Sequence, residues 1–254
     1  MSEYAAAYDV AAAAWNHGPG RLYRATAAAL LDRTPVPLAG ARVLDVGAGT
    51  GLAGTVALER GADLVVATDR SPGMLRNNAG DRSAVVGDAY ALPFAGGAFD
   101  LVVAAFLINH LDEPGRGLAE FRRVAPAVAT SSFHASWDHP AKTVVDEVMA
   151  DAGFEPPDWH TQIQSTNEQV SDPDELARAA ERAGYTEVDV TRVDVATGVD
   201  DSAAMVDWRW GMAHLAPYVA TLDDATRARL RARAESAVAG LPPVVVPMLA
   251  LSAR

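Results

Sequence analysis

The chain has 254 residues, of which 50% are hydrophobic and 21% are charged, a composition that supports one large α/β domain and excludes a disordered or fibrous chain. It has no cysteine, which excludes disulfides, thiolate metal sites and cysteine nucleophiles and favours a cytoplasmic location. The net charge of −12 disfavours nucleic acid as a partner, because phosphate binding needs clustered basic residues. We also expect no signal peptide, no membrane span and no membrane partner.

The first 40 residues are expected to form helices that cap the domain. The clearest of them spans residues 21–33 and is ended by Pro35 and Pro37. Tyr8 and Trp15 lie on an Ala-rich stretch before it, where they border a ligand or serve as packing anchors.

A glycine-rich turn follows the first apolar strand, at residues 43–51. Glycines at such a bend permit backbone angles that side chains forbid, and they let a ligand lie against the main chain. The helix predicted over residues 52–60 directs its free N–H groups at that ligand. Residues 49–54 fit the dinucleotide pattern GxGxxG, whereas residues 45–51 read DxGxGxG. Asp45 favours the second pattern, because a carboxylate there suits a cofactor that carries an ammonium and a sulfonium.

A second acidic residue ends the next buried strand, predicted over residues 64–68. Asp69 lies at the carboxyl end, where parallel sheets bind ligands, and can accept hydrogen bonds from both ribose hydroxyls. NAD and S-adenosylmethionine share that ribose, so Asp69 does not separate them. The alternative role is an N-cap for the helix that begins near Ser71.

A third motif separates the two cofactors. A short strand is predicted at 84–86, and Asp88 follows it within "GDA". The sequence "LPF" comes next at residues 92–94, and "FDLV" begins the following strand at Phe99. This order resembles the type 11 family of class I S-adenosylmethionine-dependent methyltransferases, which includes the ubiquinone and menaquinone C-methyltransferases. The resemblance covers residues 43–126 and departs from the family where Pro126-Ala127-Val128 replaces the "KPGG" turn.

The resemblance implies S-adenosylmethionine as cofactor, S-adenosylhomocysteine as product, and methyl transfer to O, N or C of a small-molecule acceptor such as a secondary metabolite. Two alternatives remain open: an enzyme that keeps the cofactor but catalyses a cyclisation or rearrangement, and a NAD-dependent oxidoreductase. The expected cofactor-binding residues are Tyr8, Asp45, Gly47, Ala48, Gly49, Gly51, Asp69, Arg70, Met74, Asp88, Ala89, Ala105, Phe106 and His110.

The element order predicts a doubly wound, Rossmann-like sheet of seven strands with an antiparallel final strand, an N-terminal helical cap and a helical insertion before the last strand. The later strands are expected at 101–105, 127–133, 186–193 and 243–251, and Pro247 suggests an edge strand or a bulge. Helices are expected at 141–152, 172–184, 202–217 and 223–239. We expect a single domain, 1–254, with a cap at 1–40, a cofactor-binding core at 41–135 and substrate-side helices with a terminal hairpin at 136–254, working as a monomer or homodimer.

Methyl transfer needs alignment of the acceptor, and an oxygen or nitrogen nucleophile also needs a base, for which histidine is suited near neutral pH. The candidate bases are His110, His134 and His214; the alternative is a site-wall or packing role for His110 and a packing role for the helix that carries His214. The candidate substrate-binding residues are Trp15, His17, Trp137 and Trp210. Trp210 and His214 are four residues apart and share a face if one helix continues through both. No spacing of acids and histidines predicts a metal.

Overall fold

The computed structural model of the chain describes residues 3–78 and 83–254. In this part of the chain, one seven-stranded sheet has the order β3-β2-β1-β4-β5-β7-β6. The strands are β1 (Arg42–Val46), β2 (Leu64–Asp69), β3 (Ser83–Val86), β4 (Leu101–Ala105), β5 (Ala127–Phe133), β6 (Val188–Ala196) and β7 (Val245–Ala253). Strands β1 to β5 are parallel, and β7 is antiparallel to both β5 and β6. The predicted doubly wound sheet with an antiparallel final strand is confirmed.

The helices of the described chain are α1 (Glu3–Trp15), α2 (Pro19–Leu31), α3 (Leu52–Glu59), α4 (Pro72–Arg76), the 3₁₀ helix η1 (Ile108–His110), α5 (Pro114–Val124), α6 (Pro140–Ala150), α7 (Asp158–Glu168), α8 (Pro173–Arg182), α9 (Ser202–Trp210), α10 (Ala216–Thr221) and α11 (Asp224–Ala237). The helical N-terminal cap therefore consists of α1 and α2.

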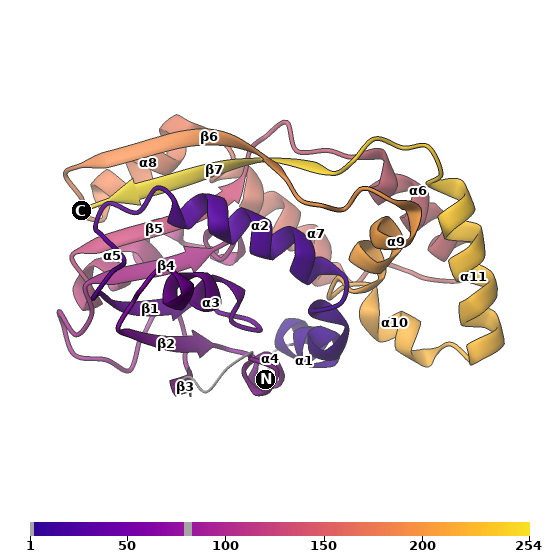
Figure 1. Cartoon of the computed structure of the whole chain (residues 1–254), viewed down its shortest axis with the longest axis horizontal. Coiled ribbons are helices and arrows are strands. Elements are labelled where there is room, and N and C mark those ends of the chain that lie inside the picture. Colours follow the sequence, from indigo (N-terminus) through magenta and orange to yellow (C-terminus); the bar gives the residue numbers. More distant parts are fainter. Residues whose placement is uncertain (1–2, 79–82) are drawn as a thin grey trace.

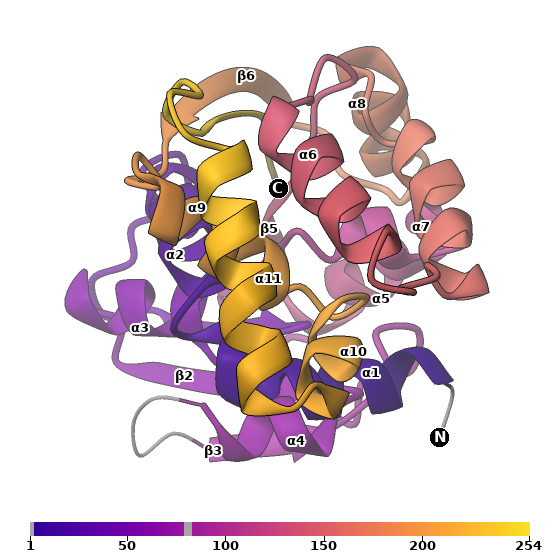
Figure 2. The same cartoon turned by 90° about the vertical axis from the view of Figure 1, so that its right-hand side faces the viewer.

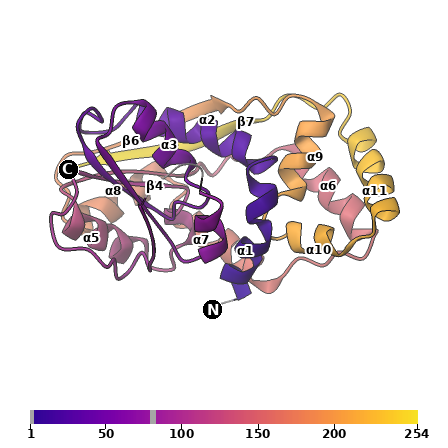
Figure 3. The same cartoon turned by 60° about the horizontal axis from the view of Figure 1, so that its bottom comes forward.

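Helices cover both faces of the sheet, which is why its central strands are apolar on both sides. On one face, Val43, Leu101 and Val103 share a core with α2 and α3. On the other face, Leu44 and Val102 pack with Phe121 of α5 and with α8. A further group of helices, α6, α9, α10 and α11, lies beyond the carboxyl ends of the parallel strands (Figure 1). This group faces the viewer in Figure 2. In Figure 3, α1 lies between the sheet and this group.

Three features differ from the sequence prediction. The helix expected over 202–217 is two helices, α9 and α10, because the chain turns at Gly211, where any side chain would meet Pro19 of α2 at 2.3 Å. Helix α7 was not predicted, because its sequence, DWHTQIQSTNE, is rich in residues that favour turns over helix. Its contact with η1 shows that tertiary packing supports it.

Pro247 lies in β7, which is an interior strand, so the edge-strand expectation is wrong. The carbonyl of Pro247 accepts a hydrogen bond from the backbone N–H of His134, immediately beyond the end of β5. In an antiparallel ladder the N–H and C=O of one residue face the same neighbour. The donor that proline lacks therefore faces the end of β5, where the regular ladder has already stopped.

No helix within residues 3–78 and 83–254 combines the length and the apolar character that crossing a bilayer requires.

Replacing Phe121 by alanine should destabilise the fold strongly, because its ring is fully buried between α5 and the sheet. We expect a loss of about 3–5 kcal/mol in the free energy of unfolding, measured by urea denaturation. Leu58→Ala on α3, where the side chain is 40% exposed, is the control and should cost less than about 1 kcal/mol. Equal losses in the two variants would contradict the assignment of the core.

Candidate cofactor and acceptor site

A cavity lies at the carboxyl ends of the parallel strands, next to the neighbouring strands β1 and β4, where the strand order reverses. Doubly wound sheets bind their ligands at this switch point. The cavity encloses about 1140 Å³ including its open mouth. Thirteen of the fourteen residues expected to bind the cofactor line it, and Gly51 does not. Gly51 instead forms the N-cap of α3.

The glycine turn between β1 and α3 brings the main chain to the cavity. Gly47, Gly49 and Gly51 have φ angles of +65°, +55° and +78°, a region that side chains disfavour. Gly47 has a second constraint, since a Cβ there would lie 2.7 Å from the side chain of Leu107. The turn can approach Leu107 only because residue 47 has no side chain.

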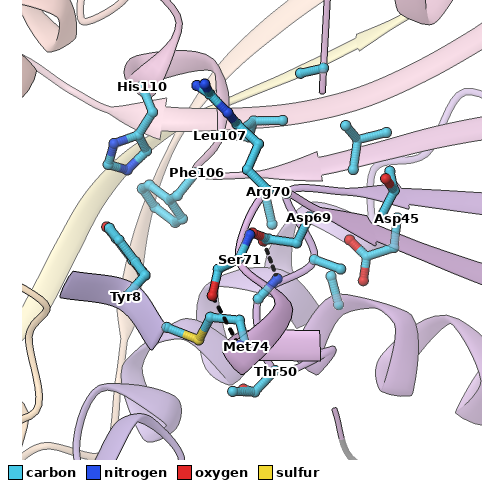
Figure 4. Close-up of a pocket in the computed structure, with 18 of the residues that line it drawn as sticks. Tyr8, Asp45, Thr50, Asp69, Arg70, Ser71, Met74, Phe106, Leu107 and His110 are labelled. Carbon is cyan, nitrogen blue, oxygen red and sulfur yellow. Dashed lines mark hydrogen bonds between the residues drawn. The ribbon is translucent and has the colours of Figure 1, made fainter. Parts of the chain in front are cut away.

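Two carboxylates, one buried on Asp45 and one half-buried on Asp69, hold this turn in place (Figure 4). One oxygen of Asp45 accepts a hydrogen bond from the N–H of Gly54, at 2.9 Å, in the first turn of α3. The Oδ2 atom of Asp69 accepts from the N–H of Gly49 and its Oδ1 from the N–H of Ser71, both at 2.8 Å. Burial raises the pKa of the Asp69 carboxyl, and these backbone N–H groups partly offset that rise. The N-cap of α4 is Ser71, and not Asp69.

The adenosine end of the predicted site contains two further polar groups. Asp88 lines the cavity and accepts a hydrogen bond from the N–H of Tyr90 at 2.9 Å. Thr68, at the end of β2, also lines the cavity, and its hydroxyl is buried with no hydrogen-bond partner in the described residues. We did not identify Thr68 from the sequence, because a threonine inside a buried strand gives no local sign of a ligand.

Helix α1 closes one side of the cavity. Its Tyr4 and Tyr8 line the cavity, and Asp9 accepts hydrogen bonds from the hydroxyl of Ser71 and from the N–H of Gly73, the latter at 2.7 Å. Beyond the helix end, Asn16 accepts from the hydroxyl of Thr50 at 2.6 Å. These bonds attach α1 both to the N-terminus of α4 and to the glycine turn.

Aromatic rings form a further wall of the cavity. The ring of Trp15 stacks on that of Tyr23 with the centroids 5.1 Å apart. The Tyr23 ring meets that of Phe106 edge-on, with a centroid distance of 5.5 Å. Tyr8 lies 5.6 Å from Trp15 and 4.9 Å from Tyr4. Burial raises the pKa of all three tyrosines, so their hydroxyls are neutral at physiological pH. Tyr23 was also missed from the sequence, because it lies outside any recognised motif.

His110 is the one candidate base that lines the cavity. Its ring lies 5.8 Å from that of Tyr4 and 6.3 Å from that of Tyr8. The Nδ1 atom is buried and has no hydrogen-bond partner among the described residues. Burial, together with the charge of His160, lowers the pKa of His110 to about 4, so the ring is neutral at pH 7.

Among the remaining candidates, Trp15 lines the cavity and the others do not. His134 is bound through Nδ1 to the hydroxyl of Ser136 at 2.8 Å, near the surface. His17 is exposed in the loop between α1 and α2. Trp137 stacks on Phe133, behind Phe106, and Trp210 is buried in the core beside α2. His214 is buried beside Arg209.

Residues 44–126 match the Methyltransf_11 family, described as a methyltransferase domain. A demethylmenaquinone methyltransferase of Renibacterium salmoninarum is 31% identical over 201 residues, which cover 74% of this chain and 83% of the relative. The chain belongs to the type 11 methyltransferase family. It is therefore a methyltransferase that uses S-adenosylmethionine, and the family assignment favours methyl transfer over cyclisation and over NAD-dependent oxidation.

Solved structures support the fold of this methyltransferase. A putative methyltransferase from an antibiotic biosynthesis pathway of Anabaena variabilis superposes with a TM-score of 0.60 at 15% identity, over 92% of this chain and 99% of the other. A phosphoethanolamine N-methyltransferase of Haemonchus contortus, solved with S-adenosylhomocysteine, gives a TM-score of 0.55 at 15% identity, over 89% of this chain and 51% of the other.

Replacing Gly47 by alanine in the methyltransferase should weaken cofactor binding through two effects, the positive φ at this position and a steric clash. The new methyl group would collide with Leu107 in addition to adopting a positive φ. We expect S-adenosylhomocysteine affinity, measured by calorimetry, to fall ~10-fold or more. Gly40→Ala is the matched control, because its φ is +78° with open space around it. That variant should lose about 1–2 kcal/mol of stability and keep its affinity.

Acid should destabilise the methyltransferase partly through His110. Its pKa is about 4 in the folded chain and 6.5 when exposed, so the unfolded chain takes up the proton first as the pH falls. Stability is therefore lost between pH 6.5 and pH 4. His110→Gln should lose less over that range, by about 3 kcal/mol, in urea titrations at several pH values. The control is His17→Gln. If the free energy of unfolding depends on pH in the same way in the wild type and in both variants, His110 is not a buried neutral residue.

Proposed function

We propose that the enzyme methylates a planar, hydroxylated aromatic acceptor. The observation that supports this is the wall of Tyr4, Tyr8, Trp15, Tyr23 and Phe106, which provides flat apolar surfaces and neutral hydroxyls but no charged group. An aromatic ring stacks favourably on such surfaces. The Renibacterium relative is named for demethylmenaquinone, which supports an acceptor with a quinol-like ring.

The three aspartates are proposed to hold the cofactor. Asp69 would accept hydrogen bonds from the ribose hydroxyls and Asp88 from the adenine amino group, while Asp45 lies beside the glycine turn that approaches the methionyl part. Asp69 already accepts one N–H on each oxygen, and each carboxylate oxygen has a second lone pair for a ribose hydroxyl. The unpartnered hydroxyl of Thr68 is proposed as a further contact.

His110 is proposed as the residue that orients the acceptor hydroxyl and takes up its proton as the methyl group is transferred. It lines the cavity, its Nδ1 is unpartnered, and its lowered pKa keeps the ring neutral at pH 7, so that one ring nitrogen can accept a proton. His214 is less suited to act as a base, since its Nε2 contacts Arg209 at 3.2 Å. The sulfonium already activates the methyl group, so alignment and exclusion of water remain as the main tasks of the protein.

The net charge of −12 supports an enzyme that works without nucleic acid, and the absence of cysteine supports a cytoplasmic location. We propose a monomer or homodimer, because the described cavity is lined within a single chain.

The test is transfer of labelled methyl from S-adenosylmethionine to a panel of hydroxybenzenes, hydroxynaphthalenes and quinols, with amines and thiols for comparison. We expect transfer to hydroxylated rings. His110→Gln should lower kcat ~100-fold with little change in the KM for S-adenosylmethionine, because general-base contributions are typically 10²–10⁴-fold. His134→Gln is the matched control and should keep its kcat. Label that never leaves the cofactor, or that goes only to amines and thiols, would overturn the proposal.

A further inference from the structure

A buried arginine lies beyond the aromatic wall, in the helices that cover the carboxyl ends of the strands. Arg209 of α9 is 4% exposed. One of its terminal nitrogens donates to both oxygens of Asp146, at 2.8 and 2.9 Å, and lies 3.2 Å from Nε2 of His214. Its Nε is buried with no hydrogen-bond partner among the described residues. Buried polar groups are normally satisfied, so this donor needs an oxygen that the described chain does not supply.

Two more protonatable groups lie around Arg209. The ring of His160, on α7, stacks on that of His214 with centroids 4.0 Å apart. Lys142, the only lysine of the sequence, lies one turn before Asp146 on α6. We call Lys142, Asp146, His160, Arg209 and His214 the Arg209 cluster. Helices α6 and α9, which carry three of these residues, contact each other.

The Arg209 cluster offers hydrogen-bond donors and positive charge. A guanidinium has no acceptor, so Nε2 of His214 must accept from Arg209, and the ring hydrogen of His214 lies on Nδ1. Burial, with the charge of Arg209, lowers the pKa of His214 to about 2, so the ring is a neutral donor. Lys142 is 32% exposed and pairs with Asp138 at 3.6 Å. Because Asp138 is 80% exposed, that ion pair contributes little and Lys142 can turn to another anion.

The cluster adjoins the acceptor end of the cavity. Trp159, next to His160 in the chain, lies 5.4 Å from Tyr4 and 6.5 Å from Tyr8, which both line the cavity. The charge of His160 acts on His110, and that of Arg209 acts on Tyr23. The cluster therefore lies close to aromatic residues that line the cavity.

We propose that the Arg209 cluster binds a carboxylate of the methyl acceptor, which makes the acceptor an aromatic hydroxy acid. This inference rests on the proposed function, because it adds an anionic group to the hydroxylated ring. Arg209 and His214 provide the buried donors, and Lys142 provides the charge at the solvent side. A carboxylate bonded by arginine and lysine is held by charge-assisted hydrogen bonds, which are stronger than neutral ones.

The experiment is calorimetric titration of the protein saturated with S-adenosylhomocysteine, in a chloride buffer. The ligands are hydroxybenzoates and hydroxynaphthoates, each compared with its own carboxamide, which has the same shape and no charge. We expect at least one acid to bind ~10-fold or more tightly than its amide. Lys142→Met and Arg209→Gln should remove most of that preference without changing the affinity for the amide.

Arg178→Gln is the matched control, since it removes one arginine from an exposed pair with Glu175 on α8 and should leave the preference intact. Unchanged S-adenosylhomocysteine affinity shows that each variant is folded. Equal binding of acid and amide, no binding of any acid, or a preference that survives in Lys142→Met would overturn the carboxylate site. Methyl transfer to uncharged phenols would still support the proposed function in those cases, and its absence would refute that function separately.

Discussion

The carboxylate of Asp69 is the constraint on which the cofactor cavity depends. It is fixed at the end of β2 and accepts one N–H from the glycine turn and one from the N-cap of α4. Ser71, which caps α4, also donates to Asp9 of α1. Bonds to an ionised acceptor are stronger than neutral ones and more directional than apolar contacts. The end of β2 thereby fixes the glycine turn, α4 and α1 relative to one another.

The side chains around the site differ in kind from one segment of the chain to the next. The ends of β1 and β2 and the loop after β3 supply acids, which suit the polar groups of a nucleoside and an ammonium. Helices α1 and α2 and the end of β4 supply neutral aromatic rings. The helices inserted after β5 and β6 supply Arg209 and its neighbours. These side chains match the polar cofactor and the proposed acceptor, which is flat beside the methyl group and anionic at its far end.

The sequence predicts the sheet and the acidic residues well, because buried parallel strands are apolar runs and their ends carry Asp45, Asp69 and Asp88. It cannot predict α7, whose own residues are poor helix formers. It also cannot predict the Arg209 cluster, because Arg209 and Asp146 are 63 residues apart and meet only through packing. The one local clue, the spacing of Trp210 and His214, was misleading because the helix ends at Gly211.

Phe106 is held firmly beside the proposed methyl-transfer position. It follows β4 with a φ of +52°, an angle that costs a bulky residue about 1–3 kcal/mol. Its N–H donates to the hydroxyl of Ser131 in β5 at 3.1 Å, and its ring lies 4.3 Å from Phe133. The strained backbone presents this ring to the cavity while its amide stays attached to the sheet. An acceptor that stacks on Phe106 would therefore be oriented by a ring that is attached to β4 and β5. Methyl transfer requires such an alignment of the acceptor.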